Sequence, residues 1–285
     1  MDPRLPGSAA PILDGAWGVR FLGLGATGQL LCEAPRDWPK VTVDVGVDPD
    51  PPVDTEWSPQ RARYRLMGGH HIDIQRDPLH VELVLCKPTA TECVVQPHLT
   101  SAASTIGSWL GRQTLHAGAF LHEGGVWGLL GEKGLGKSST LGWLARAGAA
   151  IVADDLMVWD HGMVLAGPRG VDLRPEPARR LGIGRDLGVV GTRERWRVDL
   201  SPCPPESPLR GWIFLDWGPE ARVDRLGAAE RLARLTKHRA LSMPWTDPEA
   251  LLELASRPAL LWQRPHGWDE FDAAIDGLLA GLESQ

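Results

Sequence analysis

The stretch Trp127–Asp160, WGLLGEKGLGKSSTLGWLARAGAAIVADDLMVWD, decides the fold because it combines a glycine-rich loop with two adjacent carboxylates. Residues 131–138, GEKGLGKS, fit the pattern of glycine, any four residues, glycine, lysine, then serine or threonine. Such a loop needs a strand before it and a helix after it. The apolar run 126–130 predicts the strand, and residues 138–148 predict a helix that ends at Gly148. The sequence therefore predicts a phosphate-binding loop, and the alternative is a flexible glycine turn.

The residue types in this loop suit a nucleotide and a metal ion. Glycines allow successive backbone N–H groups to turn toward an anion, and the following helix adds the positive end of its dipole. Lys137 would neutralise the terminal phosphates, and the Ser138 hydroxyl would reach Mg²⁺. The expected cofactors are therefore ATP and Mg²⁺. The predicted nucleotide-binding residues are Gly131, Glu132, Lys133, Gly134, Leu135, Gly136, Lys137, Ser138 and Ser139.

An apolar run that ends in two aspartates follows the predicted loop helix. Residues 149–155, AAIVADD, predict a strand that ends at Asp154 and Asp155. Ligands of open α/β sheets gather at the carboxyl ends of strands, where a carboxylate can face a metal ion. Adjacent residues point to opposite sides of a strand, although twist at a strand end can aim both at one site. A pair of turn-forming aspartates is the structural alternative.

Composition limits the classes of partner. The 285 residues carry a net charge of −6, which indicates no basic surface for nucleic acid or an anionic membrane. No apolar run approaches the roughly 20 residues of a membrane span, and the amino terminus lacks a secretory signal pattern. We therefore expect a cytoplasmic protein without nucleic-acid or membrane partners. The four cysteines show no paired spacing and are expected to be reduced.

The chain divides into two regions by its patterns. Residues 1–98 contain short alternating runs broken by Pro, Gly and Asp, which predict a β-rich amino-terminal domain suited to substrate recognition. A connecting helix capped by Thr100 or Ser101 is predicted to follow. Residues 99–285 form the predicted P-loop catalytic domain, so the expected fold class is α/β.

The last part of the chain predicts further elements of that domain. They are a strand at 211–218, a helix at 227–241, a strand at 258–265 and a closing helix at 268–282. Lys237 and His238 lie near the end of the helix predicted at 227–241. They are interpreted as partners of the helix dipole without a catalytic role.

Three motifs taken together resemble those of the HPr kinase/phosphorylase family. LHAGAF, GEKGLGKSS and IVADDL occur here in the family's order, and the resemblance covers about residues 110–217. It implies a catalytic domain similar to those of HPr kinase and phosphoenolpyruvate carboxykinase, rather than the common P-loop nucleotidase core.

The resemblance also implies roles for single residues. Asp154 would take the proton from the attacking serine hydroxyl, His116 would tune that carboxylate, and Ser138 and Asp155 would hold Mg²⁺. With Lys137, Asp154 and His116 form the predicted catalytic set. Phosphoryl transfer needs positioning, charge neutralisation and one proton acceptor, and it needs no protein nucleophile. Which aspartate performs which task stays open, and a buried structural histidine is the alternative for His116.

A further family motif is present only in part, in GVDLRPEPARRLGIG at residues 170–184. By resemblance, Asp172 would support the metal and Arg174 would contact the nucleotide or the transition-state charge. Pro175, Glu176 and Pro177 replace the glycines of the family. This departure puts phosphorylase activity and docking of HPr in doubt.

Three arginines alternate with other residues in the segment GTRERWRVDL. Arg193, Arg195 and Arg197 would lie on one face of a strand. They are candidates for a phosphate clamp, and a solvated charged face is the alternative.

Together these features predict an ATP- and Mg²⁺-dependent kinase that phosphorylates a hydroxyl, foremost a serine of a small protein or biosynthetic peptide. The alternatives are a small-molecule acceptor, a nucleotide-hydrolysing or decarboxylating relative of the carboxykinase fold, and a non-catalytic nucleotide-binding regulator. We expect an acceptor other than HPr, since residues 1–98 carry no motif of the family. The resemblance leaves an oligomer open.

Overall fold

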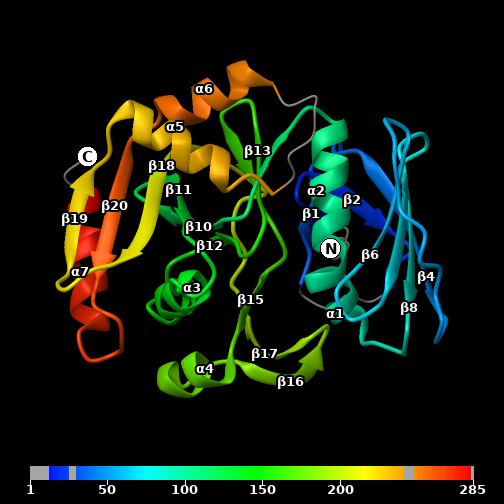
Figure 1. Ribbon diagram of the computed structural model, residues 1–285, viewed down its shortest axis with the longest axis horizontal. Helices are drawn as coiled ribbons and strands as arrows, with labels where there is room; N and C mark the ends of the chain where they lie inside the picture. Colours follow the sequence, from blue (N-terminus) through cyan, green and yellow to red (C-terminus); the bar gives the residue numbers. More distant parts are fainter. Residues whose placement is uncertain (1–12, 26–29, 241–246, 284–285) are drawn as a thin grey trace, which may run out of the picture.

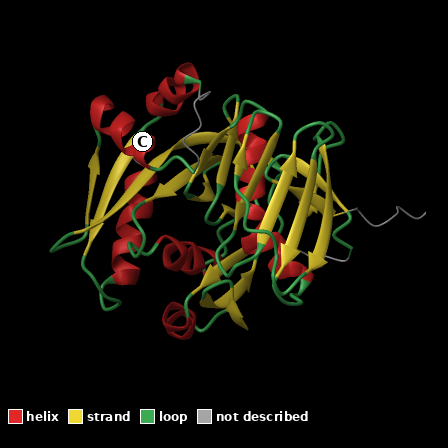
Figure 2. Cartoon of the chain, turned by 45° about the vertical axis from the view of Figure 1, so that its right-hand side comes forward, coloured by secondary structure: helices red, strands yellow, loops and turns green. Residues whose placement is uncertain are grey.

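The computed structural model describes residues 13–25, 30–240 and 247–283. Figure 1 shows two large sheets with helix α2 (Leu99–Trp109) between them and a small third sheet below. Figure 2, turned by 45°, shows most of the helices on the side of the second large sheet. The protein therefore has a mixed α/β fold with large sheets, in agreement with the predicted fold class.

The first sheet contains eight strands in the order β3-β1-β2-β4-β8-β7-β6-β5. Alternation along β4 points Val41 and Val43 to the inner face, where both are buried. The amino-terminal region is thus a sheet with one buried face. Its strands are β1 (Leu13–Ala16), β2 (Val19–Leu22), β3 (Cys32–Glu33), β4 (Lys40–Val47), β5 (Glu56–Trp57), β6 (Arg61–Arg65), β7 (His71–Gln75) and β8 (His80–Leu85).

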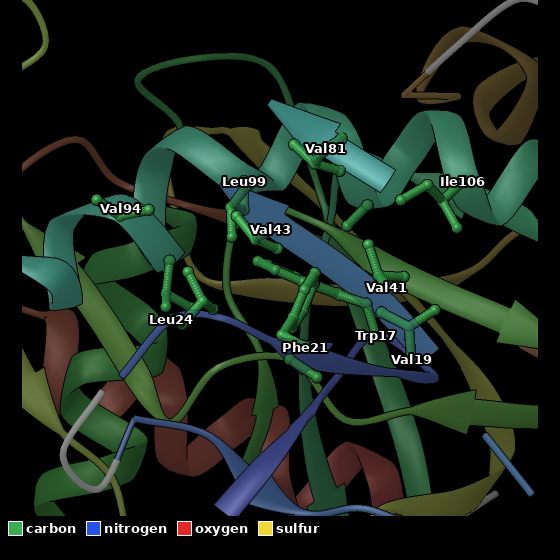
Figure 3. Packing of buried hydrophobic residues seen from close by; sticks show 14 of the residues in the cluster. Trp17, Val19, Phe21, Leu24, Val41, Val43, Val81, Val94, Leu99 and Ile106 are labelled. Carbon is green, nitrogen blue, oxygen red and sulfur yellow. The ribbon is translucent and has the colours of Figure 1, made fainter. Parts of the chain in front are cut away.

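Helix α2 connects this sheet to the rest of the chain. It continues from α1 (Thr91–Cys93) and the kinked segment η1 (Val94–His98), in which Gln96 leaves the helical region. Figure 3 shows its residues Leu99 and Ile106 among side chains of the first sheet, such as Val43. The same buried cluster includes Val158 and Leu165 of the second sheet. One apolar core therefore reaches from the first sheet through α2 to the second sheet.

The second sheet has the order β12-β10-β11-β18-β14-β13-β9, with β20 beside β18 and β19 beside β20. Strands β11, β18 and β20 are parallel, and β12 runs in the same direction because β10 is antiparallel to both β11 and β12. The carboxyl ends of these strands therefore share one edge, the usual ligand edge of an α/β sheet. The strands are β9 (Gln113–Leu115), β10 (Gly118–His122), β11 (Gly125–Leu130), β12 (Ile151–Ala153), β13 (Met157–Asp160), β14 (Met163–Leu165), β18 (Glu206–Trp217), β19 (Arg222–Arg225) and β20 (Ala259–Arg264).

The third sheet and the remaining helices surround this edge. The small sheet has the order β15-β17-β16, and helix α3 packs against β10, β12 and β15. The bounds are β15 (Gly170–Leu173), β16 (Arg185–Val190), β17 (Arg193–Asp199), α3 (Lys137–Arg146), α4 (Pro175–Leu181), α5 (Ala228–Lys237), α6 (Pro248–Ser256) and α7 (Phe271–Glu283).

Most predicted elements of the second sheet are confirmed. The strand before the loop is β11, the helix after it is α3, and the strand before the aspartates is β12. The predicted cap of the connecting helix is wrong, because α2 continues from η1 and its N-cap is His98. Within the described residues, no helix combines the length and the apolar character that crossing a bilayer requires.

Candidate active site

The glycine-rich loop leaves the carboxyl end of β11 and enters helix α3. Gly134 and Gly136 have positive φ angles of 96° and 86°, which other residues adopt only with strain. A Cβ atom on Gly136 would also lie 2.4 Å from Nη2 of Arg264. Lys137, the first residue of α3, is buried, and its Nζ donates a hydrogen bond to the carbonyl of Gly131. The loop therefore turns at two glycines immediately before helix α3.

Asp154 lies directly beside the start of α3. The Ser138 Oγ donates a hydrogen bond to Oδ1 of Asp154 at 3.1 Å. The backbone N–H of Asp172 donates to the other oxygen, Oδ2, at 3.0 Å. Strand β12 thus delivers a carboxylate to the loop serine although the two residues are far apart in sequence.

The environment of Asp154 disfavours its charged form. Its side chain is buried, and loss of water is the largest cause that raises its pKa, to about 8. The charge of Asp155 is the next largest cause and acts in the same direction, whereas the hydrogen bonds from Asp172 and Ser138 oppose this rise in pKa. A carboxyl group with a pKa near neutrality is suited to exchange a proton during a reaction.

Asp155 occupies a different environment from its neighbour. Its φ angle is +67°, so the backbone turns at this residue as the strand ends. Its side chain is 27% exposed and lies 3.7 Å from Nη2 of Arg193. The two aspartates are therefore not equivalent: one faces the loop serine from the interior, and the other faces solvent and an arginine.

His116 is exposed between buried neighbours, so the alternative of a buried structural histidine is wrong. Its backbone N–H bonds to the carbonyl of His238 at 2.8 Å. Although its tip is open to solvent, displacement of water around the ring lowers its pKa most, followed by the nearby charge of Lys137. Asp155 acts on His116 in the opposite direction and raises its pKa.

The end of helix α5 forms one wall of this site, which the sequence did not indicate. Lys237 pairs with Glu132 of the loop at 2.6 Å between exposed side chains. Burial, followed by the charge of Lys137, lowers the pKa of His238 to about 4. The interpretation of Lys237 and His238 as helix-dipole partners missed this contact, because no pattern in the sequence links residue 132 to residue 237.

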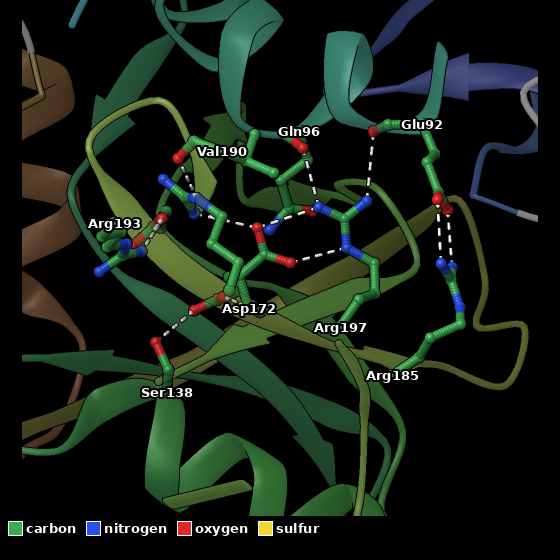
Figure 4. Close-up of polar contacts among 11 residues, drawn as sticks. Glu92, Gln96, Ser138, Asp172, Arg185, Val190, Arg193 and Arg197 are labelled. Atoms are coloured by element: carbon green, nitrogen blue, oxygen red, sulfur yellow. Dashed lines mark hydrogen bonds and ion pairs between the residues drawn. The ribbon is translucent and has the colours of Figure 1, made fainter. Parts of the chain in front are cut away.

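Asp172 and two of the predicted clamp arginines form a buried ion cluster, shown in Figure 4. Arg197 donates to both oxygens of Asp172, at 2.6 Å from Nε and 2.9 Å from Nη2, and Arg195 donates at 3.0 Å. The side chains of Asp172 and Arg197 are 0% exposed. Arg197 also donates to the backbone carbonyls of Glu92 and Gln96, which belong to the segment before α2.

This cluster corrects two sequence-based expectations. Asp172 does not fit a metal-ligand role, because guanidinium groups already occupy both of its oxygens. Arg195 and Arg197 lie on the same face of β17 as Arg193, as predicted, but they are buried against Asp172 and do not form an open clamp. Arg193 alone of the three is partly exposed, at 34% of its side chain.

Arg174 and Arg264 differ in exposure and in their contact with the loop. Arg174 is exposed at the N-cap of α4, where Pro175 takes the first helical position. Arg264 is buried, and its Nη2 donates to the carbonyl of Leu135 in the loop at 3.0 Å. Sequence reasoning missed Arg264, because only the parallel pairing of β18 with β20 carries this residue to the loop.

The donors beside the loop fit a hard divalent cation. Ser138, Asp154 and Asp155 offer oxygen ligands, and Mg²⁺ needs only one or two protein carboxylates because it keeps most of its water. Among the described residues, no group of three or more His, Cys, Asp or Glu side chains lies in an arrangement that would hold a metal by itself.

The chain shows similarity to known proteins only at the level of solved structures. A scan against protein-family models finds no match, and a search of curated proteins finds none. Among solved structures, the chain is similar to the Hpr(Ser) kinase/phosphatase from Coxiella burnetii, with 13% identity and a TM-score of 0.30. The similarity covers 60% of this chain and 96% of that chain.

Proposed function

We propose that the protein is a kinase that transfers the γ-phosphate of ATP to a hydroxyl group, with a serine of a small protein or peptide as the acceptor. The observation that carries this proposal is the hydrogen bond of 3.1 Å between Ser138 of the glycine-rich loop and Asp154. It brings a phosphate-loop hydroxyl and a strand-end carboxylate together, which is the pairing that phosphoryl transfer requires.

The chain's own residues have separate tasks in this proposal. Backbone N–H groups of the loop bind the phosphates, and Lys137 orients and neutralises the terminal ones. Ser138 and one aspartate would hold Mg²⁺, which supplies charge neutralisation at the phosphates when bound. The other aspartate accepts the proton of the acceptor hydroxyl. Asp154 is assigned this task first, because its raised pKa suits a proton acceptor near neutral pH.

A specific observation favours the reverse assignment. Asp154 is the aspartate that contacts Ser138, and a carboxylate beside the loop hydroxyl is the usual second metal ligand of a phosphate-binding loop. Asp155 is more exposed and lies beside Arg193, so an acceptor hydroxyl reaches it more easily. The tests in the Discussion separate these two assignments.

The acceptor is proposed to approach from the side of Asp155. Arg193 and His116 lie on this side, and the exposed Arg174 follows β15. The partly exposed Arg193 replaces the open clamp of three arginines as the candidate contact for acceptor or phosphate. The first sheet is the other candidate recognition surface, and we propose that it selects an acceptor different from HPr.

The test is a transfer assay with the full chain. The protein is incubated with ATP, Mg²⁺ and either a set of serine peptides or HPr, and the acceptor is read by intact mass. We expect a mass gain on a peptide, little phosphorylation of HPr, and no label transfer by Lys137→Ala. Arg179→Ala, which removes an exposed cation of α4 outside the candidate site, is the matched control and should retain transfer.

Other outcomes contradict the proposal in distinct ways. ATP hydrolysis without a labelled acceptor would support the hydrolase alternative. Nucleotide binding without turnover would support the regulator. Wild-type behaviour of Lys137→Ala would remove the loop from the mechanism, and efficient, phosphate-reversible phosphorylation of HPr would make HPr the acceptor.

A further inference from the structure

The ligand edge of the second sheet has an aromatic side that the phosphate chemistry does not use. Strands β18 and β20 end beside the loop, and their last residues, Trp217 and Arg264, are direct partners in the register. The Arg264 guanidinium lies 4.3 Å from the ring centroid of Trp217. The ring of His266 also contacts Trp217, with ring centroids 4.8 Å apart and an angle of 59° between the ring planes.

Arg264 joins this aromatic group to the phosphate loop. Besides Trp217 it contacts the rings of Trp262 and Phe271, at 5.2 and 4.9 Å, and it donates to the Leu135 carbonyl. Within the described part of the chain, its buried Nε has no hydrogen-bond partner. A buried guanidinium that contacts both the ring of Trp217 and the loop carbonyl of Leu135 ties the position of Trp217 to the loop.

The order of strands places this group opposite the aspartates. In the order β12-β10-β11-β18, Asp154 follows β12 on one side of the loop strand, and Trp217 ends β18 on the other. The two strands are three intervals apart across the sheet, roughly 14 Å at the usual spacing, and the register places Trp217 several residues further along the strand direction than Asp154. That separation is comparable with the length of an extended nucleoside triphosphate whose reactive end lies at the carboxylates.

The exposure of the rings suits a ligand with a flat aromatic face. Trp217 is only half-buried, and His266 is exposed beyond it. Aromatic side chains stack on nucleobases without demanding a particular base. Trp262, by contrast, is fully buried and serves as support for Arg264.

We propose that Trp217 and His266 form the subsite that stacks on the base of the nucleoside triphosphate. This inference rests on the proposed function for the presence of the triphosphate in the loop. The base lies on Trp217, the phosphates cross the loop, and the terminal phosphate faces the aspartate pair. Arg264 acts as a positioning residue, because it touches the loop and the ring rather than the reacting atoms.

The experiment compares two ligands that share phosphates but differ in the base. Binding of ATP and of inorganic tripolyphosphate, both with Mg²⁺, is measured by calorimetry for the full chain. We expect Trp217→Ala to weaken ATP binding by roughly 5- to 150-fold, the usual effect of losing one stacking ring, and to leave tripolyphosphate binding unchanged. His266→Ala should give a smaller loss for ATP alone, and Trp217→Phe should restore most of the ATP affinity.

A matched control is available in the first sheet. Trp57 also stacks on another ring, Tyr64, with centroids 4.8 Å apart, and it is 46% exposed. Trp57→Ala should change neither affinity. This control separates loss of the base subsite from the general effect of removing a partly exposed tryptophan.

The remaining outcomes distinguish failure of this inference from failure of the proposed function. Equal weakening of ATP and tripolyphosphate by Trp217→Ala would show an effect on the loop and would overturn the stacking role. Unchanged ATP affinity in that variant would also overturn it, even in a chain that transfers phosphate. If the protein binds ATP in a way that depends on Trp217 but transfers no phosphate, the result would support the base subsite and contradict the proposed kinase activity. Binding of neither ligand by the parent would overturn both.

Discussion

The two adjacent aspartates, Asp154 and Asp155, differ in burial and in their polar contacts. Asp154 is buried, accepts hydrogen bonds from Ser138 and the Asp172 backbone, and has a pKa raised to about 8 by burial and by Asp155. Asp155 is partly exposed and lies near Arg193. Substitution of either aspartate by asparagine keeps the shape of the side chain and removes its charge. The two substitutions therefore test the roles of proton acceptor and metal ligand separately.

We expect Asp154→Asn to retain Mg²⁺-dependent ATP binding and to lower the rate of transfer by about two to four orders of magnitude, because it lacks the proton acceptor. Asp155→Asn should lose the Mg²⁺ dependence of ATP binding. Calorimetry at several Mg²⁺ concentrations and a single-turnover transfer assay measure the two effects. The opposite pattern would exchange the two roles, and two variants with wild-type behaviour would place the reaction elsewhere.

Asp172→Asn supplies the control for this comparison. Asp172 is a carboxylate close to the pair, but its oxygens bind Arg195 and Arg197. Removal of one partner of a buried ion pair typically costs about 3–5 kcal/mol of folding free energy. We therefore expect a loss of stability in urea and an unchanged Mg²⁺ dependence in the fraction that stays folded.

Sequence patterns identified the loop and the aspartate pair, because local spacing encodes both. The burial of Arg195 and Arg197 was not predictable from their alternation in the segment. Alternation assigns residues to one face of a strand, but only the register with β15 puts Asp172 opposite Arg197 on that face. The contribution of Arg264 depends in the same way on the pairing of distant strands.

At the scale of elements, the short turn η1 lies between the first sheet and the third. His98 at its end is 4% exposed and packs edge-on against His70 of the loop before β7, with ring centroids 4.6 Å apart. Burial, followed by the charges of His70 and Arg195, lowers the pKa of His98 to about 4. The pKa of His70 is also lowered, by burial and then by Lys87. This contact therefore depends on neutral histidines.

We expect acid to weaken the fold through His98. The unfolded chain binds a proton at the ordinary histidine pKa of 6.5, whereas the folded chain resists protonation until about pH 4. The contribution of a neutral His98 is therefore complete above pH 6.5 and is lost as the pH falls toward 4. The shift corresponds to about 3 kcal/mol. Urea unfolding at pH 7.5 and pH 4.5 measures it.

His98→Gln is the matching variant, because glutamine is polar and does not titrate. Between pH 7.5 and pH 4.5, both proteins should lose free energy of unfolding, and the loss in the variant should be about 2–3 kcal/mol smaller than the loss in the parent. Equal losses in the two proteins would contradict the role of His98 and attribute the acid sensitivity to other groups.

Elements with strong periodicity, such as α3, α5 and α7, were predictable from sequence, since their apolar spacing is local. The segment from α1 through η1 was not. Pro97 lies inside it and argues against a continuous helix, and the backbone does leave the helical region at Gln96, with φ −133° and ψ 117°. Tertiary contacts hold this kinked segment in place, including the bonds from Arg197 to the carbonyls of Glu92 and Gln96.

At the scale of the whole molecule, the two large sheets depend on each other. Besides the shared apolar core around α2, several polar contacts cross between them. Trp38 donates to Glu206 at 2.6 Å, the backbone N–H of Trp17 donates to the Ala166 carbonyl at 2.6 Å, and Arg112 donates to the Gly18 carbonyl at 2.9 Å. The patterns that separate residues 1–98 from residues 99–285 are local, whereas these contacts are not, so no sequence pattern indicates them.

We therefore expect a fragment of residues 99–285 to fail to fold, although it contains the whole candidate active site. Without the first sheet, Leu99 and Ile106, both 0% exposed in the full chain, would face water. Burial of these two side chains alone contributes roughly 3–6 kcal/mol, which is a large part of the 5–15 kcal/mol that usually stabilises a domain. Near-ultraviolet circular dichroism and ATP calorimetry of the fragment test this expectation. The full chain should unfold in a single transition.

The full-length variant Ile106→Ala is the control: it should stay folded but lose about 2–5 kcal/mol of folding free energy, the usual cost of that truncation in a core. A fragment with native dichroism and unchanged ATP affinity would instead make the catalytic region independent, and it would confine the first sheet to recognition of the acceptor.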